Sequence, residues 1–147
     1  MIIDLRKIKR SGKESQDFFF EYAPERSLID IPNVDFDGAI KISGSCTLTG
    51  EHSAYIDGEV SFILSGECTR CLEQTLRPYV IEFSEGVDSD SESVYPVKND
   101  TVDLSKIVDD VIMMNIPVNF LCSEDCKGLC SGCGTNLNNG ECKCKKQ

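Results

Sequence analysis

The spacing of the cysteines constrains the fold of this 147-residue chain more than any other feature. Eight of the nine cysteines form four close pairs, and four thiolates are enough for one tetrahedral zinc site. The eight can therefore hold two ions. The predicted metal ligands fall into two sets: Cys68, Cys71, Cys122 and Cys126 for site 1, and Cys130, Cys133, Cys142 and Cys144 for site 2.

The grouping into two sites follows from spacing along the chain. Cys130-x-x-Cys133-Gly134 has the form of a zinc knuckle, a tight turn in which backbone N–H groups donate to the sulfurs. With the last cysteine pair it would form a compact site closed by loop 134–141. The other four cysteines would tie the end of the chain to the preceding domain. Spacing alone also allows Cys126 and Cys130 to exchange roles.

Both sites would have four protein ligands and no open coordination position. We therefore predict two structural Zn²⁺ ions rather than catalytic ones, although four thiolates also accept iron. The ninth cysteine, Cys46, is in phase with the aliphatic residues of a predicted strand, so we expect a small buried core residue. His52, the only histidine, lies between two predicted strands, and we expect a solvated turn residue rather than a ligand.

The N-terminal segment has charged residues but no uninterrupted apolar stretch behind them, which does not fit a signal peptide. We therefore expect a cytoplasmic protein in a reducing compartment, where structural disulfides are uncommon. This favours metal binding over disulfides as the role of the thiols. No run of residues approaches the about 18 apolar positions of a membrane span, so no membrane partner is predicted.

Hydrophobic periodicity predicts the fold. Alternating apolar residues indicate strands over residues 2–8, 18–22, 39–49, 54–67 and 76–83. One main helix is predicted over 103–116, with Asp103 as its N-cap and Pro117 after its end. Its apolar stripe should pack on the sheet, and we expect Met113 and Met114 to complete that packing, the alternative being a surface for a partner. The predicted class is α+β: an antiparallel curved β-sheet or partial barrel, one main helix and a zinc-bound cysteine-rich tail.

The predicted domain organisation has two parts. Residues 1–121 form a β-rich domain that includes helix 103–116 and an acidic, serine-rich loop at 84–101, which we expect to be mobile. Residues 122–147 form the cysteine-rich zinc-binding tail.

The charge distribution bears on the partner. The net charge is −10, yet residues 1–13 hold five basic residues against one acidic residue. An acidic body repels a phosphate backbone and suits a basic protein partner. Direct RNA contact through the basic residues of segment 6–13 is therefore expected to be weak, and a solvated strand edge is the simpler reading of that segment.

Three segments, Glu67–Glu73, Asp103–Pro117 and Leu121–Asn138, resemble the YceD-like family of large ribosomal RNA subunit accumulation proteins. The resemblance covers essentially the whole chain and is most specific from Glu67 onward. It implies a bacterial or chloroplast protein needed for accumulation of 23S ribosomal RNA, and the lack of a transit peptide favours a bacterial member. It supplies no catalytic residues.

The leading hypothesis is thus a non-enzymatic factor in large ribosomal subunit biogenesis that binds a ribosomal protein or an assembly intermediate, with no small-molecule substrate. The alternative is a cytosolic thiol redox or metal-transfer protein, which needs an accessible low-pKa cysteine or a labile metal. An RNA-processing enzyme is a weaker hypothesis, because one histidine and no recognisable nucleophile–base pair are present.

Overall fold

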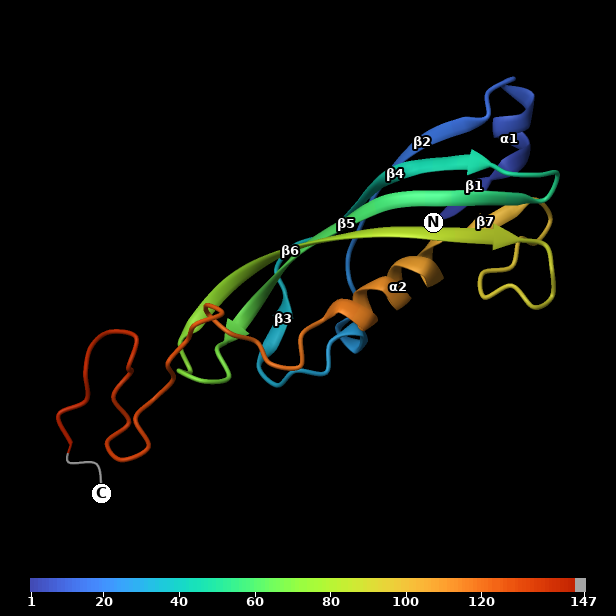
Figure 1. Ribbon diagram of the computed structural model, residues 1–147. Coiled ribbons are helices and arrows are strands. Elements are labelled where there is room, and N and C mark those ends of the chain that lie inside the picture. The colour runs from blue at the N-terminus through green and yellow to red at the C-terminus, as the bar shows by residue number, and fades with distance from the viewer. Residues whose placement is uncertain (145–147) are drawn as a thin grey trace.

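The computed structural model describes residues 1–144 and is dominated by a long, curved antiparallel sheet (Figure 1). Strand β5 is central: β4 and β3 pair with successive stretches of one of its edges, and β6, which is equally long, pairs with its whole opposite edge. β2 extends the sheet beyond β4. The strands are β2 (Ser15–Tyr22), β3 (Val34–Phe36), β4 (Ile40–Leu48), β5 (Ser53–Glu67) and β6 (Gln74–Asp88).

The alternation in the sequence predicts which side of the sheet is buried. Even-numbered apolar residues of β4 and β5 point to the core, and Ile42, Cys46, Ile56 and Val60 are fully buried. This confirms the prediction for Cys46. Burial raises the pKa of its thiol to about 11, which makes Cys46 a poor nucleophile at neutral pH.

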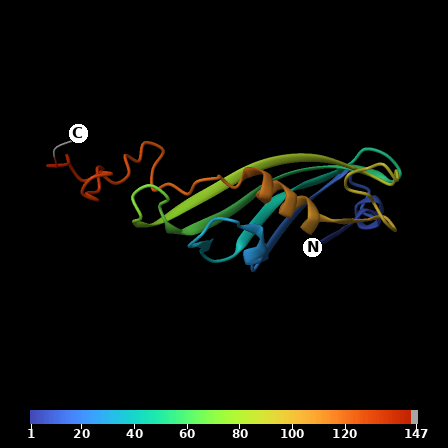
Figure 2. The same cartoon turned by 90° about the horizontal axis from the view of Figure 1, so that it is seen from below.

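Helix α2 (Leu104–Asn115) packs across the inner face of the sheet (Figure 2). Asp103 is its N-cap, as predicted, and accepts a hydrogen bond from the backbone N–H of Ser105 at 3.0 Å. The helix ends two residues before Pro117, because the position before a proline disfavours helical backbone. Its apolar stripe is buried and consists of Leu104, Ile107, Val108, Val111 and Ile112.

The prediction for Met113 and Met114 is wrong: these side chains are 60% and 84% exposed. Each helical residue advances about 100° around the axis, which places Met113 opposite the buried stripe. Met114 returns to within about 20° of Ile107, so helical phase does not explain its exposure. They leave a methionine pair on the surface near the end of α2.

The N-terminal segment also differs from its prediction. The expected strand over 2–8 is a short strand, β1 (Ile2–Asp4), followed by helix α1 (Leu5–Arg10). Asp4 caps the helix by accepting from the backbone N–H of Arg6 at 3.0 Å. Leu5 and Ile8, three residues apart and both buried, lie on one helical face, a spacing that an alternating pattern does not explain.

β1 pairs with β7 (Thr101–Asp103), so the start of the chain lies beside the start of α2. β6 continues in register with β5 as far as Asp88, so residues 84–88 of the predicted acidic loop are strand, and the loop begins at Ser89. Residues 89–100 return the chain to β7. Among the described residues, no helix is both long and apolar enough to cross a membrane.

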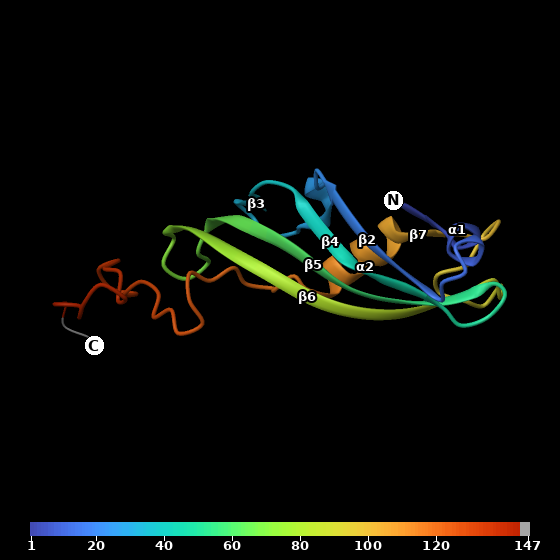
Figure 3. The same ribbon diagram turned by 90° about the horizontal axis from the view of Figure 1, so that it is seen from above.

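The molecule is elongated. β1, β7 and α1 lie at one end of the sheet, and the cysteine-rich tail projects from the opposite end (Figures 1 and 3). The division into a domain ending at residue 121 and a tail beginning at residue 122 stays a prediction.

Candidate metal centres

The first pair of cysteines lies in the tight connection between β5 and β6. Cys68 and Cys71 are buried there, and Leu72 closes the turn by donating from its backbone N–H to the carbonyl of Cys68 at 2.9 Å. Leu72 has a positive φ of 63°, an uncommon conformation for a branched residue. The turn aims both sulfurs toward the incoming tail.

The tail is fastened to this turn before its own cysteines begin. Phe120 is fully buried, and its carbonyl accepts from the backbone N–H of Thr69 at 2.7 Å. Two arginines bind the following segment: Arg70 donates to the carbonyl of Cys126 at 3.0 Å, and Arg77 donates to that of Cys122 at 3.1 Å. These contacts place residues separated by about 50 positions of sequence at one point.

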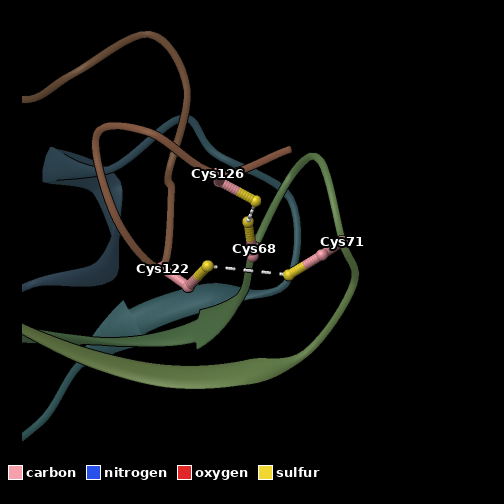
Figure 4. Close-up of side chains that lie close together, drawn as sticks. All are labelled: Cys68, Cys71, Cys122 and Cys126. Atoms are coloured by element: carbon pink, nitrogen blue, oxygen red, sulfur yellow. Dashed lines mark hydrogen bonds between the residues drawn. The ribbon is translucent and has the colours of Figure 1, made fainter. Parts of the chain in front are cut away.

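The sulfurs of site 1 converge (Figure 4). Cys68 and Cys126 have their Sγ atoms 3.6 Å apart, and Cys71 and Cys122 have theirs 3.7 Å apart. All four ligand atoms lie within 4.8 Å of one another. A tetrahedron with Zn–S bonds of about 2.3 Å has S–S edges of about 3.8 Å. The chain therefore presents four sulfurs at a spacing that fits a tetrahedral ion and is far too wide for disulfides.

The remaining pairs form a second group farther out on the tail. Their Sγ atoms also lie within 4.8 Å of one another, with 3.4 Å between Cys130 and Cys144 and 3.2 Å between Cys133 and Cys142. Cys142 and Cys144 are only 2.8 Å apart, so binding an ion would spread these sulfurs by about 1 Å. Cys133 is exposed, and this group is more open to solvent than the first.

Backbone N–H groups lower the pKa of one thiol in each group. Burial opposes ionisation of Cys68, but the backbone N–H groups of Cys71, Cys122 and Arg70 outweigh it and lower the pKa of Cys68 to about 6. In the second group, the amides of Cys133 and Gly132 lower the pKa of Cys130 to about 6.

Other thiols resist ionisation. Burial raises the pKa of Cys71 to about 12, and the neighbouring sulfurs of Cys142 and Cys130 raise that of Cys144 to about 12. Four adjacent thiolates repel one another, and a divalent cation would remove this repulsion. The donor set in both groups is therefore suited to a metal ion.

The structure brings the eight cysteines together in the two groups expected from the sequence, with Cys126 in the first and Cys130 in the second. That they bind metal stays a prediction. His52 is exposed and belongs to neither cysteine group. Its Nδ1 lies 2.8 Å from the carboxylate of Asp100.

Sequence reasoning assigned no role to Asn136 and Asn138. The side-chain amide of Asn138 donates to Cys126 Sγ at 3.3 Å, and that of Asn136 donates to Glu73 at 2.9 Å. The signal available in the sequence was the Asn-Leu-Asn-Asn-Gly run between two cysteine pairs, which is typical of a structured turn.

Comparison with known proteins identifies the family. Residues 56–147 match the family described as "Large ribosomal RNA subunit accumulation protein YceD". A maize protein named as a chloroplastic YCED homolog 1 is 37% identical over 62 residues, which cover 42% of this chain and 21% of the maize protein. Its Arabidopsis thaliana namesake is 31% identical over 61 residues, covering 42% of this chain and 19% of that protein.

An uncharacterized protein of Mycobacterium tuberculosis aligns over 147 positions at 22% identity, covering 93% of this chain and 70% of the mycobacterial protein. The chain thus spans about a fifth of the length of the plant relatives and most of the mycobacterial one. No solved structure matches the chain. Since the family match covers well over half of its residues, the chain belongs to the YceD family of large ribosomal RNA subunit accumulation proteins.

Proposed function

We propose that this protein is a non-enzymatic factor that supports accumulation of 23S ribosomal RNA by binding a basic ribosomal protein or an assembly intermediate of the large subunit. Family membership supports the role in ribosomal RNA accumulation, because the family description names an accumulation factor and no enzymatic activity. The exposed face of the sheet supports a basic partner, and this is the observation that carries the proposal.

Two neighbouring rows of side chains cross the outer face of the sheet. In one row, Asp17, Ser45, Asp57 and Ser84 are paired in sequence across β2, β4, β5 and β6. In the other, the paired residues are Phe19, Ser43, Glu59 and Glu82. We call these two rows the acidic face. The rows border a shallow hollow of about 690 Å³.

Two carboxylates of the acidic face repel each other. Glu59 lies directly opposite Glu82 on the adjacent strand, and like charges in this position destabilise a sheet. Phe19, in the same row, has 63% of its side chain in solvent. A positively charged partner would relieve the repulsion, and its aliphatic stems would cover the exposed ring. This is the complementarity expected for a lysine- and arginine-rich protein rather than for RNA.

The basic N-terminal segment supports only a weak direct contact with RNA. Arg6 pairs with Asp4 at 3.0 Å, and Lys9 pairs with Asp100 at 3.4 Å, so two of its charges already have acidic partners. This leaves three other basic residues that could contact a phosphate backbone: Lys7, Arg10 and Lys13. Such a small number of contacts gives low affinity that falls steeply with salt.

Structural Zn²⁺ completes the proposal. Site 1 would join the tail to the sheet, and site 2 would hold the tail's outer part in one conformation. Elemental analysis of protein purified anaerobically should find about two zinc ions per chain and one free thiol, that of Cys46. Absence of metal with several disulfides, or iron with a visible chromophore, would contradict structural zinc.

The partner is tested by sedimentation and complementation. Cells that lack the gene should accumulate less 23S ribosomal RNA, and the wild-type protein should restore it and sediment with large-subunit precursors. The double variant Glu59→Gln/Glu82→Gln should bind the precursors at least tenfold more weakly. Tight, salt-resistant binding of the wild-type protein to protein-free 23S RNA would contradict a protein partner.

A matched control removes the same charge elsewhere. Glu14 and Glu92 are exposed and lie outside the acidic face, so Glu14→Gln/Glu92→Gln changes the net charge equally. This variant should bind as the wild type does. Equal weakening by both double variants would show that net charge, not the acidic face, governs binding.

The exposure of the second cysteine group favours one other candidate function, a metal-transfer or thiol redox protein. Exposed Cys133 is accessible to an oxidant or to a competing chelator. Rapid zinc loss with reversible disulfide formation under mild oxidant would support this function, whereas retention of both ions would support the structural role.

A further inference from the structure

The loop that closes the second cysteine group also reaches the first. Asn138 lies in this loop, between Cys133 and Cys142, and its Nδ2 donates to Cys126 Sγ at 3.3 Å. Its Oδ1 accepts from the backbone N–H of Lys127, the residue after Cys126, at 2.9 Å. One exposed side chain thus holds both a sulfur of site 1 and the adjoining backbone.

Neighbouring residues fix the position of Asn138. The Oδ1 atom of Asn136 accepts from the backbone N–H of Asn138 at 3.0 Å, while its Nδ2 donates to Glu73 at 2.9 Å. The backbone N–H of Leu137 donates to the carbonyl of Gly128 at 2.9 Å. Gly128 has a φ of +74°, so the chain turns there in a conformation that favours glycine. Residues 136–138 therefore form a strap across site 1.

A hydrogen bond to a ligating sulfur changes how firmly the metal is held. Donors around a metal site orient the ligands and spread the negative charge of the thiolates, and their removal typically weakens metal binding by about 10- to 100-fold. Asn138 is the side-chain amide in position to do this for Cys126. It acts on the metal through the sulfur and does not ligate.

The strap forms more readily when its two ends are held. Its flanks are Cys133 and Cys142, whose sulfurs would share the ion of site 2. Without that ion, the loop between them gains conformational freedom, and placing Asn138 against Cys126 costs more entropy. Occupancy of site 2 should therefore favour the bond that stabilises site 1.

We propose that Asn138 is a positioning residue that couples the two cysteine groups, so that an ion in site 2 slows loss of the ion from site 1. The inference rests on the proposed metal sites and is independent of the ribosomal partner. By linkage, the factor by which an ion in site 2 raises the equilibrium affinity of site 1 is also the factor by which an ion in site 1 raises the affinity of site 2.

The test measures exchange of bound zinc for isotopically labelled Zn²⁺ added in excess to the purified full chain, so that site 2 stays occupied while the ion of site 1 exchanges. The wild-type chain should release zinc in two phases, fast from exposed site 2 and slow from buried site 1. Asn138→Ala should speed the slow phase by about tenfold. Asn139→Ala, which alters the adjacent asparagine in the same turn, is the matched control and should leave both phases unchanged.

A second variant separates the two bonds of Asn138. Asn138→Asp keeps the oxygen that accepts from Lys127 but loses the N–H that donates to Cys126. It should release zinc as fast as Asn138→Ala, and the Co²⁺-substituted protein should show the same shift of its thiolate-to-metal absorption in both variants. Wild-type release by Asn138→Asp would overturn the role of the N–H···S bond.

Coupling is tested in a chain without site 2. Cys133→Ser/Cys142→Ser should release the ion of site 1 faster than the wild type, and adding Asn138→Ala should change that rate little, because the strap is already loose. An equal effect of Asn138→Ala in both backgrounds would overturn the coupling while leaving two metal sites intact. A wild-type chain that binds no zinc would overturn the metal sites themselves, a distinguishable result.

Discussion

The two cysteine groups have the same donor atoms but occupy different positions in the fold. Site 1 takes residues from a turn of the sheet and from the chain after α2, and three of its four cysteines are buried. Site 2 takes its residues from 15 consecutive positions of the projecting tail, and Cys133 is exposed. The first group closes a long loop and joins two parts of the molecule, whereas the second organises only its own segment. Two sites with the same ligands can therefore contribute very differently to the stability of the fold.

The largest expected effect is loss of site 1. Cys68→Ser should remove one of two zinc ions and lower the free energy of unfolding by about 4 kcal/mol, since loss of a structural metal is among the most damaging single changes. Metal content and denaturant unfolding of the purified variant measure both quantities. If Cys68→Ser and Cys142→Ser lowered the free energy of unfolding by similar amounts, the two sites would not differ in their contribution to stability.

A core substitution separates stability from metal binding. Leu104→Ala removes a fully buried side chain of α2 and should cost about 3 kcal/mol. The zinc content should stay at about two per chain, because Leu104 lies outside both cysteine groups. Met114→Ala, on the exposed side of the same helix, should change stability by less than about 0.5 kcal/mol. A large cost at Met114 would indicate packing that its exposure does not predict.

Loss of site 2 should have only local consequences for the sheet. Cys142→Ser should remove one zinc ion and leave amide hydrogen exchange in β4 and β5 at the wild-type rate. Within residues 1–144, the strap supplies the hydrogen bond that connects the second group to the β5–β6 turn, and this turn lies far along the chain from β4. Exchange in residues 130–144 should accelerate strongly. Faster exchange throughout the sheet would mean that site 2 supports the whole molecule.

The smallest effect has the opposite sign. Glu82→Gln removes the repulsion with Glu59 and should raise the free energy of unfolding by about 0.5 kcal/mol. The effect should shrink at high salt, where surface charges are screened. Glu92→Gln, in the loop after β6, serves as control and should be neutral. A destabilised Glu82→Gln variant would contradict the repulsion on the acidic face.

Local patterns made much of the fold predictable. The strands around Cys46 and Val60 follow a period of two, and α2 follows a period near 3.6 with Asp103 at its start. Helix α1 was missed because it is only six residues long, too short for its period to stand out from an alternating pattern. Helical phase alone would have placed Met113 on the exposed side, whereas Met114 shares the phase of buried Ile107, so its exposure could not be read from the period.

Motifs and hydrophobic periods are properties of neighbouring residues, so the family, the α+β class and the two sets of four cysteines could all be predicted before the fold was known. Three contacts required the folded chain: Cys126, rather than Cys130, lies with Cys68, Asn138 spans the two groups, and Glu59 faces Glu82. Each of these depends on strand register or on the path of the chain over long separations. A shift of one residue in register would move every side chain of a strand to the other face, so such contacts are fixed by the packing of the whole molecule.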